Sequence, residues 1–240
     1  DLFGAARGRQ LASVECHDLI CMIADIVVVG GVRRSALISL SGLDDTHMRG
    51  AKSGEWWKDT SHRALANNSA VYEIRPSALE FMDEWMSLAR SGSGERGIFN
   101  RHAINRKVAS LPSRVLETFV TNPCAEVILR ASGGLCNLTE VVVRRDDTLH
   151  SLLAKVQTAA IMGTFQSTLV NFNHVRPIWS ENAQEERLLG VSLTGIMDHP
   201  VLSQTTDEAR RWLRAMKDQA SSANHTWADI LGIPASVAIT

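Results

Sequence analysis

The stretch "VTNPCAEVIL" (120–129) carries three polar side chains that could do chemistry together. Asn122, Cys124 and Glu126 occupy alternate positions between apolar flanks. Alternate residues of an extended segment point to the same side, so an amide, a thiol and a carboxylate could face one space. The thiol would supply the reactive atom, the carboxylate would move a proton, and the amide would orient a hydroxyl group. A buried structural cysteine beside a loop-capping glutamate fits the same pattern, and the spacing leaves both interpretations open.

A second cysteine, Cys136, follows in "SGGLCNLTEVVV". A strand, a glycine-containing loop and another strand could bring Cys124 and Cys136 close together, and two facing thiols would suggest redox chemistry. Two unrelated core cysteines are the alternative. A hydrolase with Cys124 as its acyl nucleophile would need a histidine base, and no histidine of the chain stands in a recognisable setting.

The motif "GGVRRS" (30–35) follows the apolar run "IVVV". Gly30 and Gly31 would let the backbone approach a ligand, and Arg33 and Arg34 would offer forked donors to a phosphate or a base edge. A tight turn with solvated arginines is an equally good interpretation of the spacing.

The motif "ALANNSAVY" (64–72) places two amides, the second of them Asn68, just ahead of an expected strand. A side-chain amide at such a place can bind sugar hydroxyls, or it can cap a turn by bonding the backbone.

Composition narrows the class of protein. The chain has 240 residues, of which 45% are hydrophobic and 21% charged, with a net charge of −1 and four cysteines. The charge gives no electrostatic case for nucleic acid or a membrane as partner. Sparse cysteines favour a reducing, cytoplasmic setting. Cys16 and Cys21 do not share a helix face and lack a second ligand pair, so we expect no metal site.

Hydrophobic periodicity predicts strands alternating with helices, and therefore an α/β fold with much parallel sheet. In "RPSALEFMDEWMSLARSG", Ser77 and Gly92 predict the two ends of a helix. The other predicted helices lie near 8–25, after Asp44 and Asp45, near 146–169 and near 205–232, with 101–115 either a loop or a surface helix. The predicted strands are 26–29, 36–41, 69–74, 116–129, 138–143 and 188–197.

Several motifs resemble one family. "TNPCAEVIL" followed by "LCNLTEVVVR" resembles the active-site finger loop of ribonucleotide reductase catalytic subunits. Four further segments resemble the same family and stand in the expected order: "GGVRRSALISL", "RALANNSAVY", "SGERGIFNR" and "EERLLGVSLTGIMDH". The residues of these motifs are most similar to those of the adenosylcobalamin-dependent class II. The resemblance implies part of a ten-stranded α/β barrel, with a central finger loop that carries the radical cysteine. Residues 1–240 would be an internal portion of that barrel domain, with its N- and C-terminal parts missing.

The resemblance also implies a role for each matching residue. Cys124 would become a thiyl radical and take the 3′-hydrogen of the ribose, Glu126 would accept the proton of the 3′-hydroxyl, and Asn122 would hold the sugar hydroxyls. Cys136 would be one of the two thiols that reduce the substrate and end as a disulfide. The expected activity is reduction of ribonucleoside di- or triphosphates to 2′-deoxyribonucleotides.

In the family, the loop matched by Gly30, Gly31, Arg33 and Arg34 lies between a deoxynucleotide effector and the substrate base. Adenosylcobalamin is the implied cofactor, a thioredoxin-type protein the implied reductant, and a homodimer a possible assembly. The alternatives are the large subunit of a class I, metal-radical reductase and a non-catalytic nucleotide-binding remnant. The 240-residue piece alone is expected to be inactive.

Overall fold

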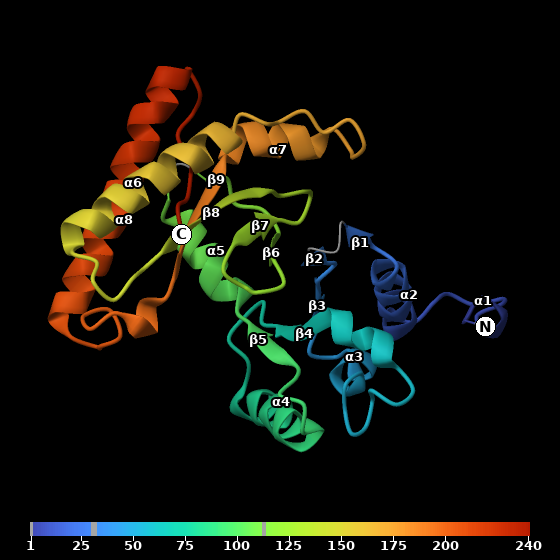
Figure 1. Cartoon of the computed structure of the whole chain (residues 1–240). Helices are drawn as coiled ribbons and strands as arrows, with labels where there is room; N and C mark the ends of the chain where they lie inside the picture. Colours follow the sequence, from blue (N-terminus) through green and yellow to red (C-terminus); the bar gives the residue numbers. More distant parts are fainter. Residues whose placement is uncertain (1, 30–32, 112–113) are drawn as a thin grey trace. The chain divides into compact units, whose positions relative to one another are not determined.

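The computed structural model describes residues 2–29, 33–111 and 114–240, and it divides into two compact units (Figure 1). The first unit is Asp1–Ser110 with Phe119–Ile128, and the second is Leu111–Thr118 with Leu129–Thr240.

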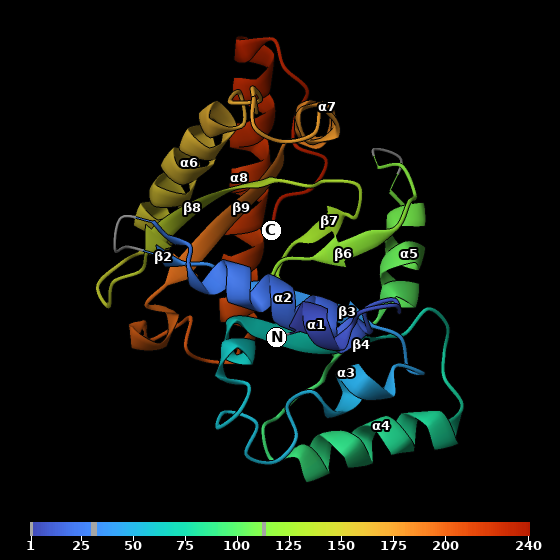
Figure 2. The ribbon, with the colours of Figure 1, turned by 90° about the vertical axis from the view of Figure 1, so that its right-hand side faces the viewer.

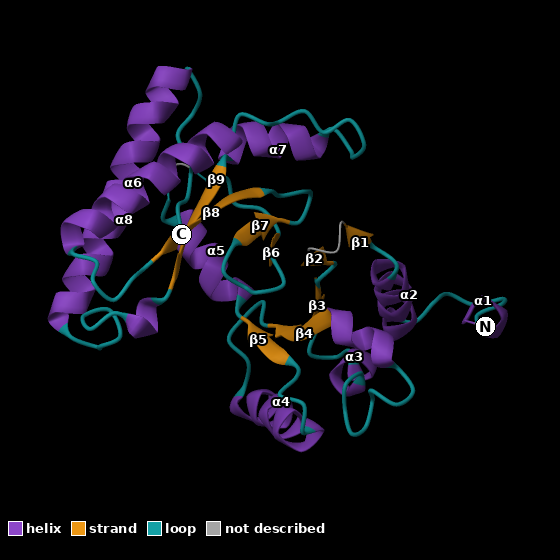
Figure 3. Ribbon diagram, viewed as in Figure 1, coloured by secondary structure: helices purple, strands orange, loops and turns teal. Residues whose placement is uncertain are grey.

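The first unit is built on a parallel sheet of three strands in the order β3–β4–β5. Figure 3 shows these strands in orange. Leu37 of β3 lies opposite Ala66 of β4, and Ser69 of β4 lies opposite Gly97 of β5. β1 and β2 form a separate antiparallel pair. The elements are α1 (Leu2–Ala5), α2 (Ser13–Asp25), β1 (Val28–Val29), β2 (Arg33–Arg34), β3 (Leu37–Ser41), α3 (Thr46–Gly50), the 3-10 helix η1 (Ser61–Leu65), β4 (Ala66–Val71), α4 (Ala78–Ser91), β5 (Gly97–Phe99), α5 (Arg101–Ala109) and β6 (Phe119–Thr121).

Helix α4 begins and ends at the residues that its sequence predicts. The Ser77 hydroxyl accepts a hydrogen bond from the Glu80 N–H at 3.2 Å, and the Glu80 carboxylate accepts one from the Ser77 N–H at 2.9 Å. This reciprocal pair satisfies two of the N–H groups that the first turn leaves unbonded. Gly92 ends the helix with φ 68°, a left-handed conformation that glycine adopts without steric cost.

The second unit is a parallel strand pair covered by helices. β8 and β9 run in register from Cys136 opposite Leu188 to Val142 opposite Thr194. Figure 2 shows α6 and α8 side by side along this pair. The elements are β7 (Ile128–Arg130), which begins at the boundary, β8 (Cys136–Val142), α6 (Leu149–Gln166), α7 (Ile178–Glu186), β9 (Leu188–Thr194), the 3-10 helix η2 (Ile196–Asp198) and α8 (Asp207–Leu231).

The core of the second unit lies between α6, α8 and the strands, where Leu152, Val156 and Met216 are almost fully buried with Leu189 of β9. Gly163 allows α6 to come close to β9, because a Cβ atom there would lie 2.1 Å from a methyl carbon of Leu189.

A buried ionic network joins helix α7 to Arg114 and Arg130. The Glu186 carboxylate lies 2.7 Å from the Arg114 guanidinium and 3.2 Å from that of Arg130. Arg130 also reaches the Glu185 carboxylate at 2.7 Å and the Asn182 side-chain oxygen at 2.8 Å. Since the charges are paired in the interior, the network fixes the chain just before β8.

Asp147 anchors the start of α6. Burial alone would raise the pKa of the Asp147 carboxyl. Hydrogen bonds from the Lys155 ammonium at 2.6 Å, the Arg144 N–H at 2.7 Å and the Ser151 hydroxyl at 2.7 Å outweigh it. They lower the pKa of Asp147 to about 2, because each stabilises the ionised form.

The α/β class and the parallel strands confirm the expected fold class, whereas the ten-stranded barrel stays a prediction. Residues 101–109 form α5, so the first part of the segment 101–115, predicted as either a loop or a surface helix, is a helix. Helix α7 is not among the predicted elements, because two of its three buried residues, Asn182 and Glu186, are polar and give no apolar periodicity. Within the described ranges, no helix combines the length and the apolar character that crossing a bilayer requires.

Candidate active site

The stretch that carries Asn122, Cys124 and Glu126 is a turn between β6 and β7, and the prediction of a continuous strand over 116–129 is wrong. The Ala125 N–H donates to the Asn122 carbonyl at 2.9 Å, and the Val127 N–H donates to the Asn122 side-chain oxygen at 3.1 Å. Ala125 has φ 64°, which reverses the chain. Pro123, with a fixed φ and no N–H, favours a turn over a strand interior.

The turn changes how the three side chains are presented. Asn122 is half-buried, whereas Cys124 and Glu126 are exposed, so the burial that the apolar flanks predicted around the thiol and the carboxylate is not found. The alternation of an extended strand does not align the three groups. All three residues instead belong to one turn, in which the Asn122 carboxamide oxygen accepts a hydrogen bond from the backbone N–H of Val127.

Strand β4 supplies a further contact to this turn, through a residue that the sequence analysis did not nominate. The Asn67 side-chain amide donates a hydrogen bond to the Pro123 carbonyl at 2.7 Å. Asn67 is exposed, whereas the neighbouring Asn68 is 3% exposed and points to the other face of the strand. The pair "NN" was the available signal, but the sequence did not indicate which of the two amides contacts the turn.

Asn68 belongs to a buried polar cluster behind β4 and not to the cysteine turn. Its side-chain oxygen lies 3.2 Å from His17 Nε2 of α2, and its backbone N–H donates to the Glu95 carboxylate at 2.8 Å. Glu95 in turn pairs at 2.9 Å with Lys52, which also donates to the Ala66 carbonyl. These contacts hold Asn68 in place behind β4, and its predicted role in binding substrate or effector stays a prediction.

The two cysteines of α2 lie apart on the helix. Cys16 is exposed, whereas Cys21 is fully buried, with its sulfur 3.8 Å from His17 Nε2. Burial raises the pKa of the Cys21 thiol, which makes this cysteine an unreactive core residue.

Cys136 is half-buried at the first position of β8, where it lies opposite Leu188 of β9. Cys136 belongs to the second unit and Cys124 to the first. Their approach to one another stays a prediction.

The motif of the expected effector loop is described only at its flanks. The Arg33 and Arg34 backbones pair with Val29 and Val28 in the antiparallel β1–β2 ladder. Gly30 and Gly31 lie outside the described residues.

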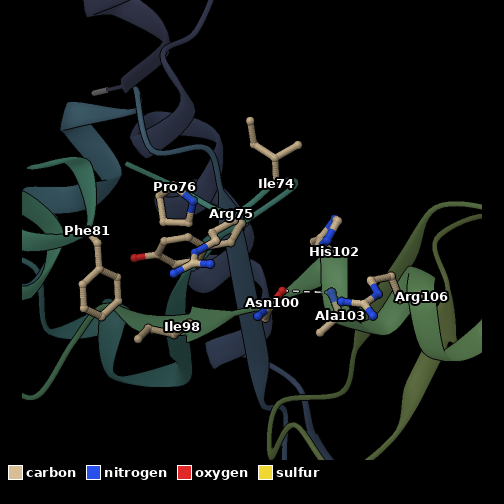
Figure 4. Close-up of a pocket in the computed structure, with 10 residues that line it drawn as sticks. Ile74, Arg75, Pro76, Phe81, Ile98, Asn100, His102, Ala103 and Arg106 are labelled. Carbon is tan, nitrogen blue, oxygen red and sulfur yellow. Dashed lines mark hydrogen bonds between the residues drawn. The ribbon is translucent and has the colours of Figure 1, made fainter. Parts of the chain in front are cut away.

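A cavity of about 380 Å³ lies at the carboxyl ends of β4 and β5 in the first unit. Figure 4 shows apolar side chains, among them Phe81 and Ile98, on one part of its lining, and Asn100, His102 and Arg106 on another. Tyr72, just after β4, also lines the cavity. Tyr72 and Asn67 are five positions apart on an extended segment, so roughly 16 Å of strand separates the cavity from the contact with the turn.

Across the ranges 2–29, 33–111 and 114–240, no three His, Cys, Asp or Glu side chains gather closely enough to hold a metal ion.

Comparison with known proteins gives a consistent result. The chain is 33% identical over 202 residues to the adenosylcobalamin-dependent ribonucleoside-triphosphate reductase of Levilactobacillus brevis, a match that covers 80% of this chain and 25% of the relative. It is 31% identical over 204 residues to the enzyme of the same name from Lacticaseibacillus paracasei, covering 82% and 26%. The chain thus spans about a quarter of the length of these curated relatives. No protein-family model matches it.

The fold agrees with the sequence matches. A crystal structure of a B12-dependent, class II ribonucleotide reductase superposes with a TM-score of 0.71, at 21% identity, over 100% of this chain and 36% of that one. A likeness at this identity establishes the shared fold, and the sequence matches carry the relationship. The chain belongs to the ribonucleotide reductase family and is most similar to its adenosylcobalamin-dependent class.

Proposed function

We propose that the protein is an adenosylcobalamin-dependent ribonucleotide reductase that converts ribonucleotides to 2′-deoxyribonucleotides. The observation that carries the proposal is a turn with Asn122, Cys124 and Glu126 in a chain 33% identical to reductases of that name. The names of these relatives favour a ribonucleoside triphosphate over a diphosphate as substrate, and they favour the cobalamin class over the metal-radical class.

The Cys124 thiol fits the role of hydrogen abstractor because it is exposed in its turn, where a radical can reach the sulfur atom. Adenosylcobalamin, when bound, would supply the radical chemistry at this thiol. Cys124, as a thiyl radical, takes the 3′-hydrogen of the ribose. The exposed Glu126 carboxylate accepts the proton of the 3′-hydroxyl, and the Asn122 amide hydrogen-bonds the sugar hydroxyls.

The 2′-hydroxyl then leaves as water, and two thiols supply two electrons and two protons as they form a disulfide. Cys136 is one of these thiols. Cys124 finally returns its hydrogen to C3′ and is again a thiyl radical. The net change is one ribonucleotide and one dithiol converted to one deoxyribonucleotide, one water and one disulfide.

The remaining partners follow from the same proposal. A deoxynucleotide effector would bind near Gly30, Gly31, Arg33 and Arg34, because the guanidinium forks suit phosphate and base edges. A thioredoxin-type protein would reduce the disulfide again, in the cytoplasm, and the protein would assemble as a homodimer.

The test is Cys124→Ala in the complete protein, assayed with a ribonucleoside triphosphate, adenosylcobalamin and dithiothreitol, with the deoxynucleotide measured by chromatography. We expect product formation to fall below detection. Cys16→Ala is the matched control, since it removes another exposed thiol from the same unit, and it should keep the parent rate. Deoxynucleotide formation by Cys124→Ala at the parent rate would refute the proposal.

A further inference from the structure

We infer that Asn67 is a positioning residue for Cys124, which it holds in place through the carbonyl group of Pro123. The inference rests on the proposed function, because it concerns the same cysteine. The Asn67 side-chain amide donates to the Pro123 oxygen at 2.7 Å across 56 positions of sequence. Pro123 directly precedes Cys124, so the bond acts on the peptide group that leads into the cysteine.

The turn needs this contact because its own hydrogen bonds leave that peptide group unrestrained. The internal bonds run from the Ala125 and Val127 N–H groups back to Asn122, and from the Asn122 N–H to the Val127 carbonyl at 3.4 Å. The Thr121 hydroxyl also donates to the Val127 carbonyl at 2.9 Å. Among the described residues, the Asn67 amide is the group that bonds the Pro123 carbonyl. Rotation of the Pro123–Cys124 peptide would redirect the Cα–Cβ bond of Cys124 while leaving the rest of the turn closed.

Strand β4 is held so that Asn67 must face the turn. Successive side chains of a strand point to opposite faces, and the next residue, Asn68, is fastened on the other face. There Asn68 contacts His17 Nε2 at 3.2 Å, while its N–H donates to the Glu95 carboxylate at 2.8 Å. A twist of the strand that withdrew Asn67 would break both contacts, of which the first is buried and the second partly buried, and unbonded buried polar groups are costly. The cluster behind the strand therefore makes Asn67 a rigid donor.

This arrangement predicts a specific kinetic effect. The Asn67 bond is exposed, so its loss should change the melting temperature little. A displacement of the reacting sulfur by about 1 Å can nevertheless lower a rate by about 100-fold. Loss of the bond should therefore lower kcat by about 10- to 100-fold and leave KM for the ribonucleotide within about two-fold, because Asn67 touches the turn and not the substrate.

The experiment uses the complete protein with three substitutions at the position. Asn67→Ala removes the amide, Asn67→Asp keeps the shape and removes the donor, and Asn67→Gln keeps a donor on a longer arm. We expect the first two to show the loss of kcat and Asn67→Gln to recover part of it. Asn173→Ala removes an exposed asparagine of the second unit and should leave kcat unchanged.

Hydrogen exchange gives a readout that does not depend on turnover. The amides of Ala125 and Val127 should exchange several-fold faster in Asn67→Ala, because the turn loses its outside support, while the amides of β8 and β9 keep the parent rate. An unchanged kcat in both Asn67→Ala and Asn67→Asp would overturn the inference, and so would unchanged exchange in the turn. If Cys124→Ala keeps activity, the proposed function fails instead, and the exchange experiment still decides whether Asn67 holds the turn.

Discussion

Replacing Glu186 by glutamine should open the second unit locally. The Glu186 side chain is 2% exposed, and its partners Arg114 and Arg130 are 4% and 7% exposed. Removing the charge leaves two guanidinium groups in the interior with less compensation. Breaking a buried ion pair in this way costs about 3–5 kcal/mol. We expect a value near 3 kcal/mol, because Arg130 keeps its contact with Glu185.

Glu185→Gln is the matched control, since Glu185 precedes Glu186 in α7 and also pairs with Arg130 at 2.7 Å. Its side chain is 55% exposed, so water screens the charge. Exposed pairs of this kind contribute about 0.2–1 kcal/mol. The two substitutions therefore change the same chemical group on adjacent residues, and they differ in burial and in the number of arginines that the carboxylate contacts.

Hydrogen exchange of the β9 amides measures the free energy of local opening. About 3 kcal/mol corresponds to roughly 100-fold faster exchange for Glu186→Gln, since each 1.4 kcal/mol is a factor of ten. Glu185→Gln should accelerate the same amides less than about five-fold. Equal exchange in the two variants would refute the reasoning, because it would mean that burial does not set the contribution of this network.

Two further predictions concern effector control and acid stability. Arg33→Ala should weaken the dependence of base selection on the deoxynucleotide effector while some turnover remains, and the exposed Arg90→Ala should not; product ratios measured with and without effector decide this. Asp147 has a pKa of about 2 against an ordinary value of 3.8, so its contribution to stability is present above about pH 4 and is lost as the pH falls toward 2. The free energy of unfolding of Asp147→Asn should therefore be lower than that of the parent at pH 5, and the two values should converge near pH 2. A difference in free energy that stayed constant between pH 5 and pH 2 would contradict this prediction.

Sequence patterns predicted the helices and strands whose own residues include cap residues or a run of apolar side chains. Helix α4 follows from its cap residues Ser77 and Gly92, and β8 and β9 follow from runs of apolar residues. Helix α7 could not be predicted in this way, since its buried face is largely polar and its support comes from arginines distant in sequence.

In the candidate site, too, features set by local residues could be predicted and features set by distant contacts could not. The motif around Cys124 was evident from its residues, but the strand interpretation failed because Pro123 and the positive φ of Ala125 turn the chain. The role of Asn67 could not be predicted, because its partner lies 56 positions away and only the strand's orientation distinguishes it from Asn68.

The parallel pairing of β8 with β9 has a consequence for biosynthesis. Cys136 begins a strand whose partner starts at Leu188. At about 5–20 residues per second, the ribosome needs roughly 3–10 s to make the roughly 50 intervening residues. During that interval the nascent chain presents a cysteine on an unpaired strand edge, which oxidants and other nascent chains can reach. A reducing environment therefore protects the Cys136 thiol from oxidation before the protein has folded.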